Sequence, residues 1–377
     1  MSIENLADLA DPRAAPRVVL KVGSALLCGN DGRPNRAWLA TLAGEIAEAQ
    51  GRGQKVIVVS SGAVALGAAR LGFAKSGRGS LADAQAAAAV GQIALAGLWS
   101  ELLGEHGLTA AQLLLTLDDL EDRRRYLNAA ATLGRLLGAG AVPVINENDS
   151  VATQEIRFGD NDRLAARVAQ AARAEAVILL SDIDGLYDRD PRQTGASLLP
   201  RVEGVTEAVH AMASDSSGSG LGSGGMTSKL QAAEIATRAG IALAIVNGTH
   251  ERPLARALGS DIGTLFVPTR RDRARKAWLG GRQRLRGAVV VDAGCAGALL
   301  KGGSLLASGI TAVEGEFTRG DPVGVRDAAG KALAQGLAEY DSGEVERIKG
   351  RRSEEHAELL GYAPRSAVIH RDQLVLL

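Results

Sequence analysis

The chain has 377 residues, which at about 150 residues per domain predicts two to three domains. Hydrophobic residues make up 46% of the chain and charged residues 23%, values that exclude collagen-like, coiled-coil and disordered proteins. Lysine plus arginine and aspartate plus glutamate each number 43, so no net charge draws the whole chain to DNA or to an anionic membrane.

The N-terminal sequence and the number of cysteines indicate the cellular location of the protein. No basic segment followed by an apolar one opens the chain, so we expect no signal peptide. No stretch approaches 18 uninterrupted apolar residues, so we expect no membrane-spanning segment. The two cysteines, Cys28 and Cys295, lie too far apart in sequence to indicate a zinc site, and two thiols make no disulfide framework. We therefore expect a cytoplasmic protein with no membrane partner.

Short apolar segments alternate with longer Ala-rich segments through the first two thirds of the chain. The apolar segments predict strands at Arg17–Val22, Lys55–Ser60, Val142–Ile145, Ala176–Leu180 and Ile241–Val246. The Ala-rich segments predict helices at Arg36–Gln50, Leu81–His106, Asp122–Leu137, Asp162–Ala174 and Thr227–Ala239. Continuous apolar strands separated by helices indicate a mostly parallel sheet covered on both faces, a three-layer α/β/α sandwich. The ligand site of such a sheet lies at the carboxyl ends of its strands.

The composition changes near residue 269. Eight lysines and arginines fall between residues 269 and 286, which predicts a charged linker at residues 269–285. Glycine-rich β-like segments follow at Ala288–Val291, Val323–Val325 and Ala367–His370. They predict a small β-barrel or sandwich over residues 286–377, after a larger domain at residues 1–268.

Turns with small residues follow the first two predicted strands. Lys21 lies at the end of the first strand, before Gly23 and Ser24, where an ammonium group and backbone N–H groups can face a phosphate. Ser61 follows the second strand and precedes a helix-like segment, and such a turn suits a carboxylate or a phosphate. Each turn alone is also explained by a surface lysine or by a serine helix cap.

Two dense polar turns follow the strand predicted at Val142–Ile145. Residues 146–149 read Asn-Glu-Asn-Asp, and residues 159–162 read Gly-Asp-Asn-Asp. They offer acceptors for an ammonium group and amide donors for carboxylates, as an amino-acid ligand requires. The spacing of a calcium-binding EF-hand loop is absent here and also at Ser181 and Asp182, so we expect no metal site built by the protein.

Residues 215–229 form a Gly- and Ser-rich run that ends at a predicted helix start. A flexible linker would explain the glycines. Lys229, however, lies in the first helical turn, where a purely structural role favours an acidic residue, so it indicates a bound anion. The run fits neither a dinucleotide-binding fingerprint nor a Walker A loop, because no strand precedes it and no glycine precedes Lys229. The five histidines lie outside all of these turns, so the site must work without an obvious histidine base.

Taken together, these turns resemble the amino-acid kinase superfamily, and within it the branch that phosphorylates glutamate. The motifs that carry the resemblance are Lys21–Ser24, Ser60–Ala63, Asn146–Asp149, Gly159–Asp162, Asp182–Tyr187 and Gly220–Lys229. The segment after residue 285 is similar to a PUA domain, which bacterial members of that branch carry. The resemblance covers nearly the whole chain, and it implies the amino-acid kinase fold with a PUA-like C-terminal domain.

The resemblance implies that ATP and L-glutamate give L-glutamate 5-phosphate and ADP, the first step of proline biosynthesis. It implies that Lys21 and Lys229 flank the transferred phosphoryl group and that Asp162 orients both lysines. The nucleotide-binding residues that it implies are Lys21, Gly23, Ser24, Ser181, Asp182, Ser223, Gly224, Gly225, Met226, Thr227, Ser228 and Lys229.

The same resemblance implies that Ser61, Asp149 and Asn161 hold glutamate, with Asp149 beside its ammonium group. It implies that Mg²⁺ enters with ATP and is held mainly by phosphate oxygens. It further implies feedback inhibition by proline and a homo-oligomer, either a dimer or a tetramer. The N-terminus extends beyond the family pattern, and the sequence assigns no role to this extension.

Two rival interpretations stay open. The first is a sister kinase acting on N-acetylglutamate, aspartate or UMP, although an acetylated substrate lacks the ammonium group that would pair with Asp149. The second is an RNA-binding or RNA-modifying protein led by its C-terminal segment. From residue 269 onward Lys plus Arg number 18 and Asp plus Glu 14, which permits weak phosphate contact. We do not favour RNA binding, because such a charge cluster is typical of a solvated face.

Overall fold

The computed structural model describes residues 2–29, 32–73, 77, 79–151, 160–213, 225–268, 285–365 and 367–377. The chain divides into two compact units, Met1–Asp122 with Asn128–Arg271 and Arg123–Leu127 with Asp272–Leu377. Nearly all of the linker predicted at residues 269–285 lies outside the described residues. The domain boundaries drawn from the sequence therefore stay predictions.

An eight-stranded sheet forms the centre of the first unit, in the order β3-β4-β2-β1-β5-β7-β8-β6. Its strands are β1 (Arg17–Val22), β2 (Lys55–Ser60), β3 (Ala110–Leu115), β4 (Val142–Glu147), β5 (Ala176–Ser181), β6 (Arg201–Glu203), β7 (Ala242–Asn247) and β8 (Thr264–Val267). Every neighbouring pair is parallel except β7 and β8. All five strands predicted for this sheet form, and β1 and β2 have the predicted bounds.

The remaining three strands of this sheet were not predicted, for physical reasons that differ. β6 and β8 have three and four residues, too few to show a period. β3 lies at the edge of the sheet, and its side chains are mostly half-buried, so it lacks the continuous apolar pattern of the central strands. The sequence pattern therefore predicts the buried centre of the sheet better than its borders.

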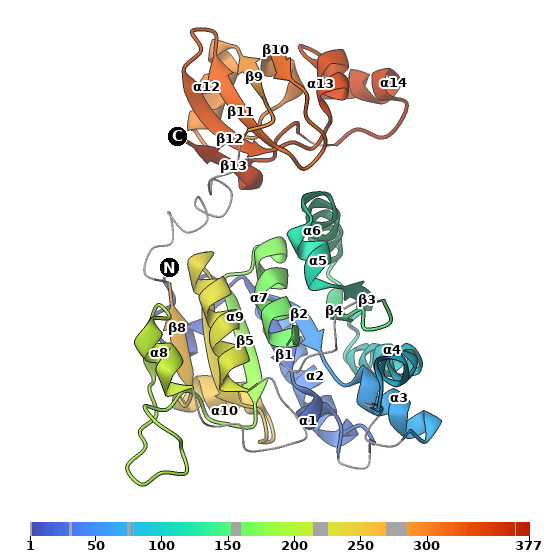
Figure 1. Ribbon diagram of the computed structural model, residues 1–377, viewed down its shortest axis with the longest axis vertical. Helices are drawn as coiled ribbons and strands as arrows, with labels where there is room; N and C mark the ends of the chain where they lie inside the picture. Colours follow the sequence, from blue (N-terminus) through green and yellow to red (C-terminus); the bar gives the residue numbers. More distant parts are fainter. Residues whose placement is uncertain are drawn as a thin grey trace. The chain divides into compact units, whose positions relative to one another are not determined.

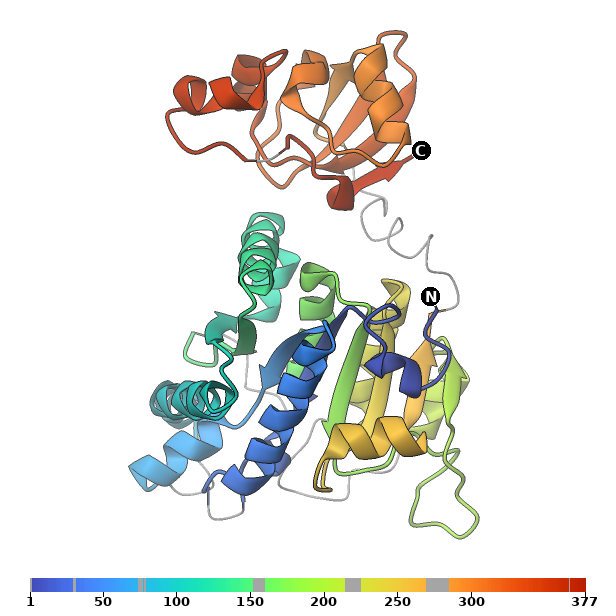
Figure 2. The same ribbon diagram turned by 180° about the vertical axis from the view of Figure 1, so that it is seen from behind.

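Helices cover both faces of the sheet. They are α1 (Ser24–Leu27), α2 (Arg36–Gly51), α3 (Ala63–Leu71), α4 (Leu81–Gly104), α5 (Leu117–Glu121), α6 (Arg123–Gly138), α7 (Asp160–Ala172), α8 (Glu207–Met212), α9 (Met226–Arg238) and α10 (Pro253–Ser260). α7 and α9 lie over one face, and α2 and α10 lie over the other (Figures 1 and 2). The predicted α/β/α sandwich with a mostly parallel sheet is confirmed.

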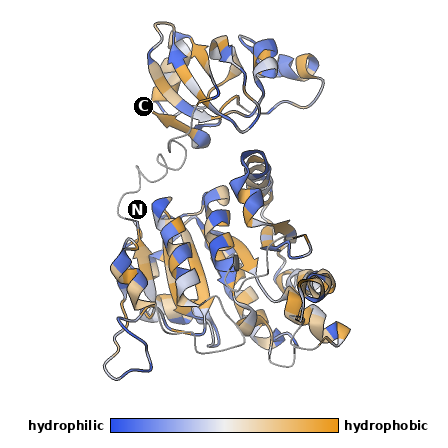
Figure 3. Ribbon diagram, viewed as in Figure 1, coloured by the Kyte–Doolittle hydropathy of each residue, from blue (hydrophilic) through white to orange (hydrophobic). Residues whose placement is uncertain are grey.

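Alternation along β1 directs Lys21 toward the side of the sheet that α7 and α9 cover. Val18, Leu20 and Val22 belong to the core cluster that residues of α2 and α4 complete. Because successive side chains of a strand point to opposite faces, Lys21 lies on the other face. Figure 3 shows that the strands are mostly hydrophobic, whereas α7 and α9 carry both kinds of residue. The charged side chain of Lys21 thus lies between the sheet and these two helices.

Helices α3 and α4 approach until their backbones touch. A Cβ atom added to Gly67 would lie 1.7 Å from the carbonyl oxygen of Ala87, and one added to Gly91 would lie 1.7 Å from that of Ala63. Only glycine fits at these positions, since carbon atoms in contact normally lie about 3.5–4.0 Å apart. The contact fixes where α3 begins, directly after the turn that contains Ser61.

Replacing Gly91 by alanine should lower the free energy of unfolding by about 1–3 kcal/mol, because the obstacle is backbone and the two helices must separate. The matched control is Gly97→Ala on the same helix, where an added Cβ meets nothing within 4 Å. That change should be neutral or stabilise by up to about 1 kcal/mol. Urea unfolding followed by the fluorescence of the buried Trp38 and Trp99 measures both values. Equal unfolding free energies for the two variants would contradict this contact.

Among the described residues, α4 is the one helix long and apolar enough to cross a membrane by length and composition. Half of its most apolar 18-residue window is buried within the protein. Trp99 of α4 donates a hydrogen bond from Nε1 to Ser60 Oγ at 3.1 Å, which ties the helix to the end of β2. The expectation of no membrane-spanning segment stays a prediction.

The N-terminal extension packs onto the first unit. Ile3, Leu6 and Leu9 are each at most 2% exposed and join the same core cluster as α2. The side-chain amide of Gln54 donates to the carbonyl oxygens of Leu9 and Ala15, at 2.8 and 2.9 Å. The extension therefore has a structural role that the sequence pattern did not indicate.

A five-stranded sheet forms the second unit, in the order β10-β9-β11-β12-β13. Its elements are β9 (Gly287–Val291), α12 (Ala293–Leu300), β10 (Ile310–Gly315), β11 (Pro322–Asp327), β12 (Ala332–Leu337), α13 (Ser342–Ile348), α14 (His356–Leu360) and β13 (Leu374–Leu376). The strands predicted at Ala288–Val291 and Val323–Val325 lie within β9 and β11. The strand predicted at Ala367–His370 is wrong. The N–H groups of Val368 and Ile369 both bond to the carbonyl oxygen of Leu305, so only an isolated bridge forms.

Candidate active site

Lys21, Asp162 and Lys229 meet at the carboxyl end of β1. Lys21 Nζ lies 2.6 Å from Asp162 Oδ1, and Lys229 Nζ lies 3.6 Å from Asp162 Oδ2. Asp162 lies in the first turn of α7 and Lys229 in the first turn of α9. The three residues are 7%, 0% and 6% exposed, in chain order. Three distant parts of the chain thus form one buried cluster of two ammonium groups and one carboxylate.

The three ionisable groups of this cluster affect one another's pKa values. Burial raises the pKa of Asp162, but the two ammonium groups outweigh burial and hold that pKa below its ordinary value. Burial lowers the pKa of Lys229, Asp162 raises it in part, and the charge of Lys21 lowers it further. The cluster therefore keeps Asp162 ionised near neutral pH, and an anion bound beside the two lysines would favour their charged forms.

The turn after β1 lies beside this cluster. A Cβ atom added to Gly23 would lie 3.7 Å from Lys21 Nζ, so the backbone at Gly23 faces the ammonium group directly. Ser24 follows as the first residue of α1. The structure thus brings together the lysine and the small residues that the sequence predicted to face a phosphate.

The start of α9 is a second element that suits an anion. Gly225 caps the helix, and Met226, Thr227 and Ser228 precede Lys229 in its first turn. Helix N-termini attract anions because their N–H groups lack intrahelical partners. Two further residues predicted to bind nucleotide, Ser223 and Gly224, lie outside the described residues.

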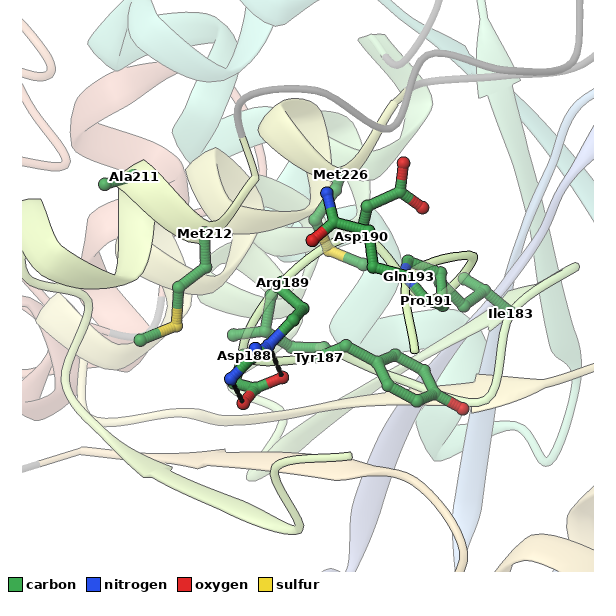
Figure 4. A pocket seen from close by; sticks show the side chains of 11 residues that line it. Ile183, Tyr187, Asp188, Arg189, Asp190, Pro191, Gln193, Ala211, Met212 and Met226 are labelled. Atoms are coloured by element: carbon green, nitrogen blue, oxygen red, sulfur yellow. Dashed lines mark hydrogen bonds and ion pairs between the residues drawn. The ribbon is translucent and has the colours of Figure 1, made fainter. Parts of the chain in front are cut away.

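A cavity of about 190 Å³ includes Met226 of one segment predicted to bind nucleotide and begins directly after the other, Ser181 and Asp182. Ser181 ends β5 and Asp182 follows it, with 3.3 Å between Ser181 Oγ and Asp182 Oδ1. The cavity wall begins at Ile183, directly after Asp182, and includes Met226 (Figure 4). Its lining combines the apolar side chains of Ile183 and Met226 and the ring of Tyr187 with a polar segment that contains Asp188 and Arg189. Such a lining suits a flat aromatic ring.

Polar side chains gather at the carboxyl ends of β2 and β4. Asn161 Nδ2 donates to Ser61 Oγ at 2.8 Å and to Asn146 Oδ1 at 3.2 Å. Asp149, two residues after the end of β4, is 9% exposed. Ser61 and Asn161, two of the three residues predicted to hold glutamate, are therefore in contact. Asn146 was not among the predicted binding residues, although the Asn-Glu-Asn-Asp motif contained it.

Sequence reasoning missed Gln92 of α4 altogether. Its side-chain Nε2 donates to the carbonyl oxygen of Glu147 at the end of β4, at 3.2 Å, and the residue is 6% exposed. In the sequence Gln92 is a single amide side chain in an Ala-rich helix. Its link to the site depends on α4 passing the carboxyl ends of the strands, which the sequence pattern does not show.

Within the part of the chain that the structure describes, no group of three or more His, Cys, Asp or Glu side chains could hold a metal ion. Asp162, the carboxylate deepest in the site, is occupied by two ammonium groups. Asp182 is exposed. The donor set fits a magnesium ion only where phosphate oxygens supply most of the ligands.

Comparison with known proteins gives matches over both units. Residues 16–247 match the model of the amino acid kinase family, and residues 287–360 match that of the PUA domain. The chain is 69% identical to the glutamate 5-kinase of Novosphingobium aromaticivorans over 100% of both chains. It is 58% identical to the glutamate 5-kinase of Sphingopyxis alaskensis, over 98% of this chain and 100% of that one. It is 52% identical to the glutamate 5-kinase of Zymomonas mobilis, over 100% of this chain and 95% of that one.

Proposed function

Because the chain belongs to the amino acid kinase family, we propose that it transfers the γ-phosphoryl group of ATP to the side-chain carboxylate of L-glutamate. The products are L-glutamate 5-phosphate and ADP, and the reaction is the first step of proline biosynthesis. The observation that carries this proposal is the buried Lys21–Asp162–Lys229 cluster at the carboxyl edge of the sheet. Full-length identity of 52–69% to three glutamate 5-kinases supports the choice of substrate.

The chemistry needs no general base. A glutamate side chain has an ordinary pKa of about 4.3, so near neutral pH it is already an ionised nucleophile. The barrier is electrostatic, because one anion must approach another, and phosphoryl transfer is catalysed by positioning and charge stabilisation. The ammonium groups of Lys21 and Lys229 supply that stabilisation on the transferred phosphoryl group. Asp162 acts through them as a positioning residue.

Nucleotide binding is assigned to the two segments that border the cavity of Figure 4. The purine base enters the cavity lined by Ile183, Tyr187 and Met226, and the phosphates extend toward the starts of α1 and α9. Mg²⁺ arrives with ATP and lowers the charge that the phosphates present to the attacking carboxylate. Gly23, Ser24 and the first turn of α9 supply the backbone donors for the phosphates.

Glutamate is assigned to the polar cluster at the ends of β2 and β4. Ser61 and Asn161 present a hydroxyl and an amide that already contact each other. Asp149 supplies a nearly buried carboxylate for the ammonium group. Proline, which also carries an ammonium and a carboxylate, would compete here as a feedback inhibitor. The working enzyme is a cytoplasmic homo-oligomer, either a dimer or a tetramer.

A substrate panel tests the proposed function. The full chain is assayed with ATP and MgCl₂ against glutamate, N-acetylglutamate, aspartate and UMP, with ADP release and hydroxylamine trapping of the acyl phosphate as readouts. Glutamate should give a kcat/KM at least about 100-fold above N-acetylglutamate and UMP, because a site that binds a buried ammonium discriminates strongly against acceptors that lack it. Aspartate keeps the ammonium but is one methylene shorter, so its kcat/KM should be about tenfold or more below that of glutamate. A higher kcat/KM for any other acceptor would overturn the assignment.

A further inference from the structure

One buried amide oxygen at the site has no hydrogen-bond donor among the residues that the structure describes. Gln92 Oε1 is fully buried and has no hydrogen-bond partner among the described residues. The orientation of the amide is set by its other end, because Gln92 Nε2 lies 3.2 Å from the carbonyl oxygen of Glu147. A carbonyl oxygen only accepts, so the amide nitrogen must face it and Oε1 must face away.

The backbone contact between α3 and α4 places this oxygen at the amino-acid end of the site. Gly91, the neighbour of Gln92, touches Ala63, which lies two residues after Ser61. Glu147, the acceptor of the Gln92 amide, follows Asn146 directly. Gln92 therefore contacts the end of β4 through its side chain and adjoins the start of α3 through its neighbour Gly91. Asn161 joins the same region by contacting Ser61 and Asn146.

A second buried acceptor near these strand ends has no donor within the described part of the chain. Asn161 Oδ1 is also fully buried without a hydrogen-bond partner among the described residues, while its Nδ2 is occupied by Ser61 and Asn146. Buried acceptors without donors are costly and uncommon in native proteins. Two of them near the ends of β2 and β4, with the nearly buried Asp149 two residues after β4, indicate that the missing partner is a ligand with several N–H donors.

The geometry points to Gln92 as the residue that recognises the ammonium group of the acceptor amino acid, an inference that rests on the proposed function. Ionised carboxylates only accept hydrogen bonds, so the ammonium is the sole donor that glutamate offers. Its three N–H bonds match Gln92 Oε1, Asn161 Oδ1 and the Asp149 carboxylate. Gln92 is then a specificity-determining residue that selects free amino acids over N-acylated or deaminated acids.

The test compares the affinity for glutamate with that for glutarate, which has both carboxylates and no amine. Gln92→Met keeps the side-chain length and removes the acceptor. We expect the KM for glutamate to rise about tenfold or more, while the KM for ATP and the Ki of glutarate as a competitive inhibitor stay within about twofold. A role in packing alone would raise the KM and the Ki together, and that result would overturn the inference.

Two further variants keep the test decisive. Gln92→Glu retains an acceptor and adds a negative charge, so it should increase the ratio of glutarate Ki to glutamate KM. A ratio at or below the wild-type value contradicts the inference.

The control variant is Gln54→Met. It removes another buried amide, one that bonds to Leu9 and Ala15 away from the site, and should leave the ratio unchanged. If wild-type protein fails to phosphorylate glutamate, the proposed function falls. If it succeeds and Gln92→Met leaves the ratio unchanged, only the role of Gln92 falls.

Discussion

Replacing Lys229 or Lys21 by alanine should lower kcat by about 100-fold or more. Each ammonium group stabilises charge on the phosphoryl group as it moves between oxygens, and losing one such preorganised group typically costs a factor of about 10²–10³ in kcat. The two effects should not simply multiply, because both lysines share Asp162 and act as a unit. Steady-state kinetics with saturating glutamate and ATP measure kcat for the single and double variants.

The matched control for this experiment is Lys55→Ala. Lys55 is the first residue of β2, and Lys21 lies near the end of the adjacent, parallel β1. The two lysines therefore lie at opposite ends of neighbouring strands. The removal of Lys55 changes the net charge equally and should leave kcat within about twofold of wild type. Activity within twofold of wild type in Lys21→Ala or Lys229→Ala would remove that residue from the mechanism.

The sequence supports the assignment of these two lysines because each departs from its local pattern. Lys21 interrupts the apolar run RVVLKV one residue from its end, and Lys229 lies where a helix dipole disfavours a cation. Strand ends and helix starts are local properties, so both positions could be predicted. The fold then places the two lysines together. In a parallel α/β sheet, the carboxyl ends of the strands and the starts of the helices that follow them lie on the same side.

Other parts of the site depend on contacts that local patterns do not encode. Gln92 reaches the site because glycines 67 and 91 allow α3 and α4 to touch, and nothing in an Ala-rich helix reports how closely a second helix approaches. The N-terminal extension is similar, since Leu9 is held by Gln54, which is distant in sequence. Asp162 was assigned by family resemblance, and its position between two cations emerges only from the packing of α7 and α9 on β1.

Replacing Asp162 by asparagine should lower the free energy of unfolding by about 3–5 kcal/mol, the cost typical of leaving a buried charge without its partner. Here two ammonium groups would face each other without the carboxylate between them. The kcat should fall as well, because neither lysine keeps its orientation. The double variant Lys21→Met/Asp162→Asn removes one of the orphaned charges, so it should be more stable than additivity predicts by about 1–3 kcal/mol. Strict additivity would show that the carboxylate and the lysine do not interact.

The pH dependence of the Asp162→Asn effect gives an independent check on the charge of this residue. The pKa of Asp162 is lowered in the folded protein, so its stabilising contribution is complete above the unfolded value of about 3.9 and is lost as pH falls through the folded value. The difference in unfolding free energy between wild type and Asp162→Asn should therefore stay constant from neutral pH down to about pH 5 and shrink below it. Urea unfolding followed by tryptophan fluorescence at pH 7, 5 and 3.5 measures this difference. A difference that grew on acidification would mean that the carboxyl group is neutral in the folded protein. Lys21 and Lys229 would then have no carboxylate between them to orient them. The role proposed for the three residues in phosphoryl transfer would be wrong.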